Sequence, residues 1–187
     1  MSLAVFENFL IFAERAVAAR GKLPAEIDAA ELESALVGHG VVLLHSHMEQ
    51  CLRAAVEKRC RRCTDLEILS LTLTVIDKEM GKLGLDSIKG TLKRFGEPCK
   101  AAFGSALKSA GLDDGSSGPW VSVMNQRSQV AHQGLPATCS LADLRLYYDD
   151  IRRILGFFCA ALSLTAVEVS AVSPLIVLPE LLRSCPE

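Results

Sequence analysis

An arginine and a histidine five residues apart, Arg127 and His132, are the side chains of this sequence best suited to chemistry. They lie in residues 119–133 (PWVSVMNQRSQVAHQ), a predicted helix with a proline at its start and a glycine directly after its end. Arg127 stands in line with the apolar residues of this helix, namely Trp120, Met124 and Ala131. Because burying a guanidinium without partners is costly, a core-facing arginine requires a carboxylate or several other acceptors.

The spacing of the pair does not place the two residues on one face of the helix. At 100° per residue, their Cα atoms differ by about 140° around the axis. A long arginine and a histidine in the last turn can still converge on a shared groove, especially across a subunit interface. A structural ion pair and a histidine satisfied at a helix end fit the same spacing, which therefore does not decide between structure and chemistry.

Metal or redox chemistry would have to come from the cysteines. Among the seven cysteines, Cys60 and Cys63 have the spacing of metal ligands, but the chain has no second pair of this kind. Structural zinc sites need four ligands, and His45 and His47, two residues apart, lie on different faces of a helix. We therefore expect reduced thiols, no metal and no cofactor.

Composition restricts the class of protein. The chain has 187 residues, of which 50% are hydrophobic and 22% charged, with a formal net charge of −2. This excludes a disordered chain and argues against nucleic-acid binding through bulk charge alone. The uncharged stretch 154–167 is shorter than the roughly 20 residues that span a bilayer. No basic region opens the sequence, so no secretory signal is expected, and the prediction is a cytoplasmic protein without a membrane segment.

Apolar residues recur at helical spacing and nowhere alternate convincingly, so we predict an all-α fold, a single bundle of five to seven helices. Helices are expected at residues 3–19, 28–59 and 64–82, near Asp86 and Pro98, at 119–133, and after a Ser140–Asp143 capping box. Two glycines inside the second helix, Gly38 and Gly40, suggest a bend or break there. The helical domain is expected to cover residues 1–168, followed by an extended tail at 169–187.

The segment 127–134 (RSQVAHQG) resembles the R-N-x-x-A-H-G signature of the HEPN superfamily of helical, RNA-targeting domains. Residues 42–56 (VLLHSHMEQCLRAAV) resemble the long helix of these domains, in which Glu49 would be the acidic residue near the middle. Residues 90–103 (GTLKRFGEPCKAAF) and 138–145 (TCSLADLR) resemble the segments that flank the motif in the RiboL-PSP-HEPN and related MAE-type branches. The resemblance is clearest over residues 35–165.

This resemblance implies an α-helical homodimer whose motif helices face each other across a groove, and a metal-independent endoribonuclease acting as a toxin or in defence. RNA and a cognate antitoxin protein are the implied partners. In such an enzyme His132 would be the general acid and base, and Arg127 would stabilise the phosphate. Glu49 would orient or hold Arg127, and Asn125 and Gln129 would add hydrogen bonds.

One position departs from the family pattern. Ser128 follows the motif arginine, where the family usually has asparagine, aspartate or histidine. This favours an alternative in which the chain is a non-catalytic HEPN module that binds RNA or a protein partner. A third hypothesis is an unrelated helical interaction protein in which Arg127 and His132 are structural.

A cluster of basic residues near the end of the second predicted helix is a candidate contact for the RNA backbone. A solvated helix end is the competing interpretation, since cations interact favourably with helix C-termini. The cluster consists of Lys58, Arg59, Arg61 and Arg62.

Overall fold

The computed structural model describes residues 3–19, 21, 28–79, 84–113, 118–173 and 176. Within these ranges the chain is all-α and has no strand, as predicted, but it forms eight helices rather than five to seven. The helices are α1 (Leu3–Ala18), α2 (Ala29–Cys60), α3 (Leu66–Glu79), α4 (Leu85–Arg94), α5 (Glu97–Ser109), α6 (Pro119–Gln133), α7 (Leu141–Ala161) and α8 (Ala166–Val172).

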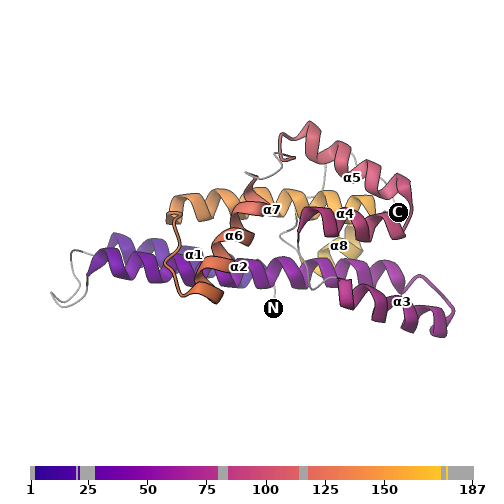
Figure 1. Ribbon diagram of the computed structural model, residues 1–187, viewed down its shortest axis with the longest axis horizontal. Helices are drawn as coiled ribbons and strands as arrows, with labels where there is room; N and C mark the ends of the chain where they lie inside the picture. Colours follow the sequence, from indigo (N-terminus) through magenta and orange to yellow (C-terminus); the bar gives the residue numbers. More distant parts are fainter. Residues whose placement is uncertain are drawn as a thin grey trace.

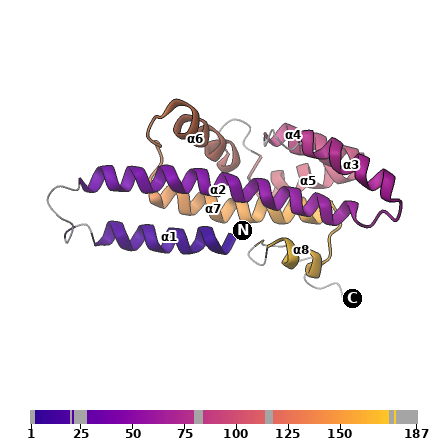
Figure 2. The same ribbon diagram turned by 90° about the horizontal axis from the view of Figure 1, so that it is seen from below.

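Helices α2 and α7 are the long central elements, and the remaining helices cover them (Figure 1). Helices α1 and α6 pack at one half of the pair, on opposite sides of it, while α3, α4, α5 and α8 surround the other half (Figure 2). The candidate motif helix α6 therefore packs on α2 and α7 but leaves one of its faces uncovered.

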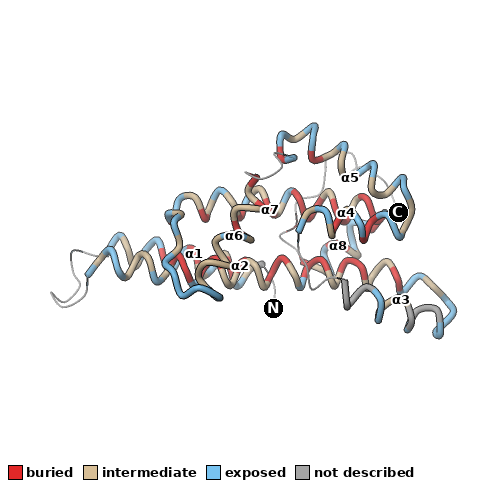
Figure 3. The backbone as a smooth tube through the Cα atoms, viewed as in Figure 1, coloured by how far each residue is buried: buried red, intermediate tan, exposed pale blue. Residues whose placement is uncertain are grey.

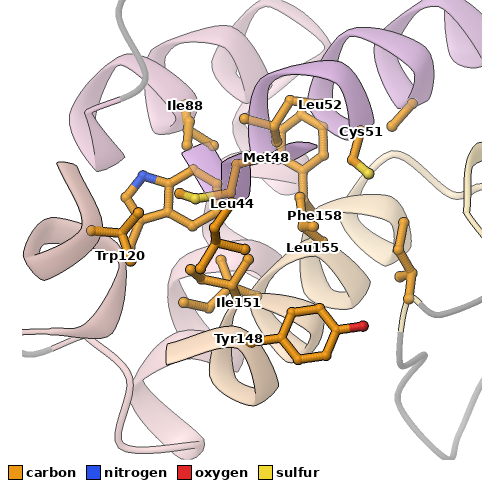
Figure 4. Close-up of a cluster of buried hydrophobic side chains, with 14 of the residues drawn as sticks. Leu44, Met48, Cys51, Leu52, Ile88, Trp120, Tyr148, Ile151, Leu155 and Phe158 are labelled. Atoms are coloured by element: carbon orange, nitrogen blue, oxygen red, sulfur yellow. The ribbon is translucent and has the colours of Figure 1, made fainter. Parts of the chain in front are cut away.

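The core follows the inner faces of α2 and α7, where buried residues recur along the length of both helices (Figure 3). At its centre the side chain of Trp120 from α6 packs among residues of α2, α4 and α7 (Figure 4). Its fully buried neighbours include Leu44, Met48, Ile88 and Ile151. This packing fixes the N-terminal end of α6 and so determines where its last turns lie.

Gly40 does not interrupt α2, which is one helix through both of its inner glycines. A Cβ atom at Gly40 would lie 2.5 Å from Leu144 Cδ2 of α7 and 2.8 Å from Phe9 Cε1 of α1. The glycine is thus explained by the close approach of three helices rather than by the predicted bend or break.

Side chains cap several helices. The predicted capping box of α7 is confirmed, with the Ser140 backbone N–H donating to Asp143 (2.9 Å) and the Asp143 N–H donating to Ser140 Oγ (3.1 Å). The helix expected from residue 64 begins at Leu66, and Asp65 accepts from the Glu67 N–H at 3.0 Å.

The predicted domain end at residue 168 falls inside a helix, because α8 continues to Val172. Val169 is buried, and Arg62, two residues after the end of α2, binds Glu168 through two bonds of 3.2 and 2.5 Å. Residues 169–173 thus belong to the bundle, while residues 177–187 of the predicted tail lie outside the described part of the chain. None of the described helices is long and apolar enough to cross a membrane.

Candidate functional site

Helix α6 turns its apolar side toward α2. Trp120 is buried at the start of this helix, and near its end Val130 faces Gly38, where a Cβ atom would lie 3.5 Å away. Ala131, which we expected in this stripe, is instead exposed, so the inward position in the last turns is residue 130. Arg127 is half-buried at the edge of the contact with α2, rather than in the core.

The side chains of Arg127 and His132 meet directly. Nη1 of the guanidinium contacts Nε2 of the imidazole, although the two Cα atoms are far apart around the helix axis. An arginine can only donate hydrogen bonds, so Nε2 of His132 is the acceptor in this contact. The predicted convergence of the two side chains therefore occurs within one chain, with His132 at the exposed end of α6.

On α2, His45, Glu49 and Arg53 follow one another at intervals of one turn and so share a face. The Glu49 carboxylate accepts from Arg53 Nε at 3.1 Å and also lies 3.1 Å from Arg53 Nη2. In this structure Glu49 thus binds an arginine of its own helix, while the contact of Arg127 is with His132.

His45 belongs to the surroundings of Arg127. Burial lowers the pKa of His45, the positive charge of Arg127 lowers it further, and the charge of Glu49 partly opposes both. His45 is therefore a second imidazole beside Arg127, and its lowered pKa keeps it neutral at pH 7. From the sequence, His45 was considered only as a metal ligand, although its four-residue spacing from Glu49 could have indicated a shared face.

The predicted supporting residues of α6 are in different environments. Asn125 is exposed, and Ser128 and Gln129 are half-buried. The backbone carbonyl of Gln129 accepts from the N–H groups of Gly134 and Leu135, which ends the helix. The side-chain oxygen of Gln129 is buried and has no hydrogen-bond partner among the described residues.

Gln126, which sequence reasoning passed over, holds the segment that follows the motif. Its Nε2 donates to Thr138 Oγ1 at 2.6 Å, and its Oε1 accepts from the Thr138 N–H at 2.8 Å. Gly134 begins this segment in the left-handed conformation (φ 64°), which favours glycine. Helix α6 thereby fixes the position of residues 134–138 beside its own last turn.

A groove of about 550 Å³ lies between this segment and the first half of α2. Its walls are mostly apolar, and its polar side chains all come from α2. The residues that line the groove include Glu31, Ser34, Gly38, His39, Val130 and Gly134. The groove adjoins the exposed end of α6, where His132 contacts Arg127.

The predicted basic cluster lies at the far end of α2 and in the turn that follows it. Lys58 is 13 residues beyond His45, about 20 Å at a rise of 1.5 Å per residue. Arg61 binds Glu57 through bonds of 3.0 and 2.5 Å, and Arg62 binds Glu168. The structure therefore does not bring these residues together with Arg127. Arg59 and Arg62 instead line a separate pocket of about 360 Å³ near α3 and α4.

Cys60 and Cys63 lie beside this second pocket. Burial raises the pKa of the Cys60 thiol, and Cys63 Sγ lies 3.6 Å from the backbone oxygen of Asp65. Within the described ranges, no three histidine, cysteine, aspartate or glutamate side chains are grouped so that they could hold a metal ion.

Comparisons with known protein families, with curated proteins and with solved structures give no match for this chain.

Proposed function

We propose that this chain is an HEPN-type, metal-independent endoribonuclease in which Arg127 binds the phosphate and His132 transfers the proton. The observation that carries the proposal is the direct contact of the two side chains at the exposed end of α6. A guanidinium presents parallel donors that match phosphate oxygens, and a neutral imidazole is the usual proton carrier near pH 7. Both groups needed for RNA transesterification are therefore available at one point of the surface.

The contact also suggests an order of events. Without RNA, the guanidinium of Arg127 covers the lone pair of His132 Nε2. A phosphate diester carries a negative charge and presents two oxygens that match the fork of the guanidinium, so it draws Arg127 away from the imidazole. Nε2 is then free to accept a proton from the ribose 2′-OH.

The reaction that follows is balanced without a co-reactant. The 2′-oxygen attacks the adjacent phosphorus as its proton passes to Nε2, and the bond from phosphorus to the 5′-oxygen breaks. The imidazolium of His132 returns the proton to this leaving oxygen. The products are a 2′,3′-cyclic phosphate and a 5′-OH, and Arg127 stabilises the negative charge that develops on the phosphate oxygens.

Charges near the site are compatible with an anionic substrate. Glu49 would repel a phosphate if it were free, but Arg53 neutralises it. The lowered pKa of His45 leaves that side chain neutral at pH 7, so Arg127 carries the positive charge that the phosphate meets beside His132. Ser128, Asn125 and Gln129 would supply further hydrogen bonds, as in the sequence hypothesis.

We further propose that the enzyme works as a homodimer, with its α6 helices facing each other, as a toxin or defence component restrained by an antitoxin protein. Support comes from the resemblance of residues 35–165 to the HEPN pattern and from Leu135, a large apolar side chain that is half-exposed next to the pair. Light scattering at tens of micromolar tests the dimer, and a monomer would contradict it.

The decisive experiment incubates the purified chain with mixed RNA in EDTA. We expect cleavage to 2′,3′-cyclic phosphate ends, and its loss in both Arg127→Ala and His132→Ala. Arg15→Ala, an exposed arginine of α1, is the matched control and should cleave like the wild type. Cleavage retained in both site variants would refute the assignment.

Ser128 favours one second candidate, a non-catalytic HEPN module that binds RNA or a protein partner. In that case wild-type protein will bind RNA without cleaving it, and Arg127→Ala will weaken the binding. Ser128→Asn, which restores the family pattern, should then introduce or increase cleavage. If instead the wild type cleaves and Ser128→Asn changes the rate little, the catalytic proposal holds.

A further inference from the structure

We propose that the groove between the first half of α2 and residues 134–138 binds the base of the nucleotide next to the scissile phosphate, and that it selects guanine. This inference rests on the proposed function, because the phosphate is the one held by Arg127. It adds a substrate preference, which neither Arg127 nor His132 can supply.

The groove is in the right place for a neighbouring base. Val130 and Gly134, two residues before and two after His132, both line it. Its volume of about 550 Å³ lies within the range of roughly 300–1,000 Å³ that small-molecule sites occupy. A nucleotide whose phosphate contacts the end of α6 can therefore place its base in the groove without leaving the surface.

The walls suit the flat face of a base. Gly38 lies buried beside Val130 at the bottom of the groove, and the side chains of Ala35, Pro136 and Ala137 add small apolar surfaces. The wall formed by residues 134–138 is held by the two hydrogen bonds between Gln126 and Thr138. The shape is thus present before RNA binds, which reduces the entropy lost on binding.

The polar edge of the groove distinguishes between bases. Glu31, Ser34 and Gly38 lie on one face of α2, so the carboxylate stands at the rim above the glycine floor. A carboxylate only accepts hydrogen bonds and has two oxygens. Guanine presents two adjacent donors, N1–H and N2–H, on its Watson–Crick edge, whereas adenine, cytosine and uracil place an acceptor beside each donor. Only guanine satisfies both oxygens.

His39 of α2 also lines the groove. Its ring packs against Phe9 of α1, with 5.3 Å between the ring centroids and 60° between the planes. This contact holds an exposed imidazole at the mouth of the groove, where its NMR signals will report on a bound base.

The test is an NMR titration of the full chain with GMP, AMP, CMP and UMP, followed at the His39 ring and the Gly38 amide. We expect GMP to bind at least about tenfold more tightly than the others, the effect of one charged hydrogen bond. Glu31→Gln should remove this preference, because its amide replaces one acceptor by a donor. Glu33→Gln is the matched control, because Glu33 lies two residues after Glu31 on α2 but does not line the groove.

A second variant blocks the groove without touching its polar edge. Ala35→Phe places a ring in it, and thermal unfolding followed by circular dichroism checks that the variant is folded. It should abolish GMP binding, whereas Ala102→Phe at an exposed position of α5 should not. Equal binding of all four nucleotides, or GMP binding unchanged by Glu31→Gln and Ala35→Phe, would overturn the proposal.

Different results would contradict the guanine preference and the proposed nuclease activity. RNA cleavage that depends on Arg127 and His132 but shows no preference for guanine would remove the subsite and leave the enzyme. No cleavage of RNA would remove the enzyme, and the GMP titration would still decide whether the groove recognises guanine.

Discussion

Two glycines of α2 should respond in opposite ways to the same substitution. Gly38 and Gly40 lie in one uninterrupted helix, two residues apart. Replacing either by alanine stabilises the helix by about 0.5–1 kcal/mol, because glycine is the more flexible residue in the unfolded chain. This gain is common to both variants and cancels when they are compared.

The surroundings of the new methyl group decide the difference. At Gly38 the Cβ atom would lie 3.5 Å from a Val130 methyl carbon, an ordinary contact, so we expect the variant to be more stable than the wild type by the helix gain. At Gly40 it would lie 2.5 Å from a methyl carbon of fully buried Leu144 and 2.8 Å from the Phe9 ring. Overpacking of this kind costs about 1–3 kcal/mol.

The measurement is the midpoint of thermal unfolding of the two variants at one protein concentration. Gly40→Ala should be less stable than Gly38→Ala by about 1–3 kcal/mol, which is roughly 3–9 °C for a chain of this size. Urea unfolding supplies an independent value of the same difference. If the two variants unfold together, the close approach of α1 and α7 at Gly40 does not explain the glycine, and the reasoning fails.

Three further predictions concern titration. Arg127→Gln should raise the pKa of His45, because the positive charge of Arg127 lowers it. Glu49→Gln should lower the same pKa, because the negative charge of Glu49 raises it. An NMR titration of the His45 ring checks both directions. Burial lowers the pKa of His47 below its usual 6.5, so the unfolded chain binds the proton more readily than the folded chain. The free energy of unfolding therefore decreases as the pH is lowered beneath about 6.5, by at most about 1.4 kcal/mol per pH unit. His47→Leu should flatten this dependence in urea unfolding at pH 7.5 and 5. The guanidinium of Arg62 lowers the pKa of the Glu168 carboxyl from 4.5 to about 2. Glu168→Gln should therefore destabilise the chain at pH 7 and have little effect at pH 2. Equal destabilisation at the two pH values would contradict the pairing.

The helices could be predicted from the sequence because their signals are local. Pro119 and Gly134 bracket α6 at the predicted bounds, and the Ser140–Asp143 capping box forms as expected. The end of the bundle could not be predicted in this way. The short helix α8 is tied to the turn after α2 through Glu168 and Arg62, residues 106 positions apart, and no local pattern predicts such a contact.

The candidate site could be predicted only in part. Spacing gives the positions of the Arg127 and His132 Cα atoms around the axis, but it does not say how far a guanidinium bends back along its own helix. It likewise does not show which of two acceptors, Glu49 or His132, the guanidinium takes. The position of His45 depends on the packing of α6 on α2, which is a property of the folded bundle.

The partner of Arg127 also bears on how a chain with a net charge of −2 would present a site for phosphate in the proposed function. Several arginines of this protein bind carboxylates, namely Arg53, Arg61, Arg62 and Arg145. Each of these would exchange one anion for another on meeting RNA, with little electrostatic gain. Arg127 contacts an imidazole instead of a carboxylate, so in the proposed function a phosphate would supply the negative charge that this contact lacks. Local pairing, rather than total charge, would thus make this arginine a favourable point for an anion, and in the proposed reaction the same exchange would uncover Nε2 of His132.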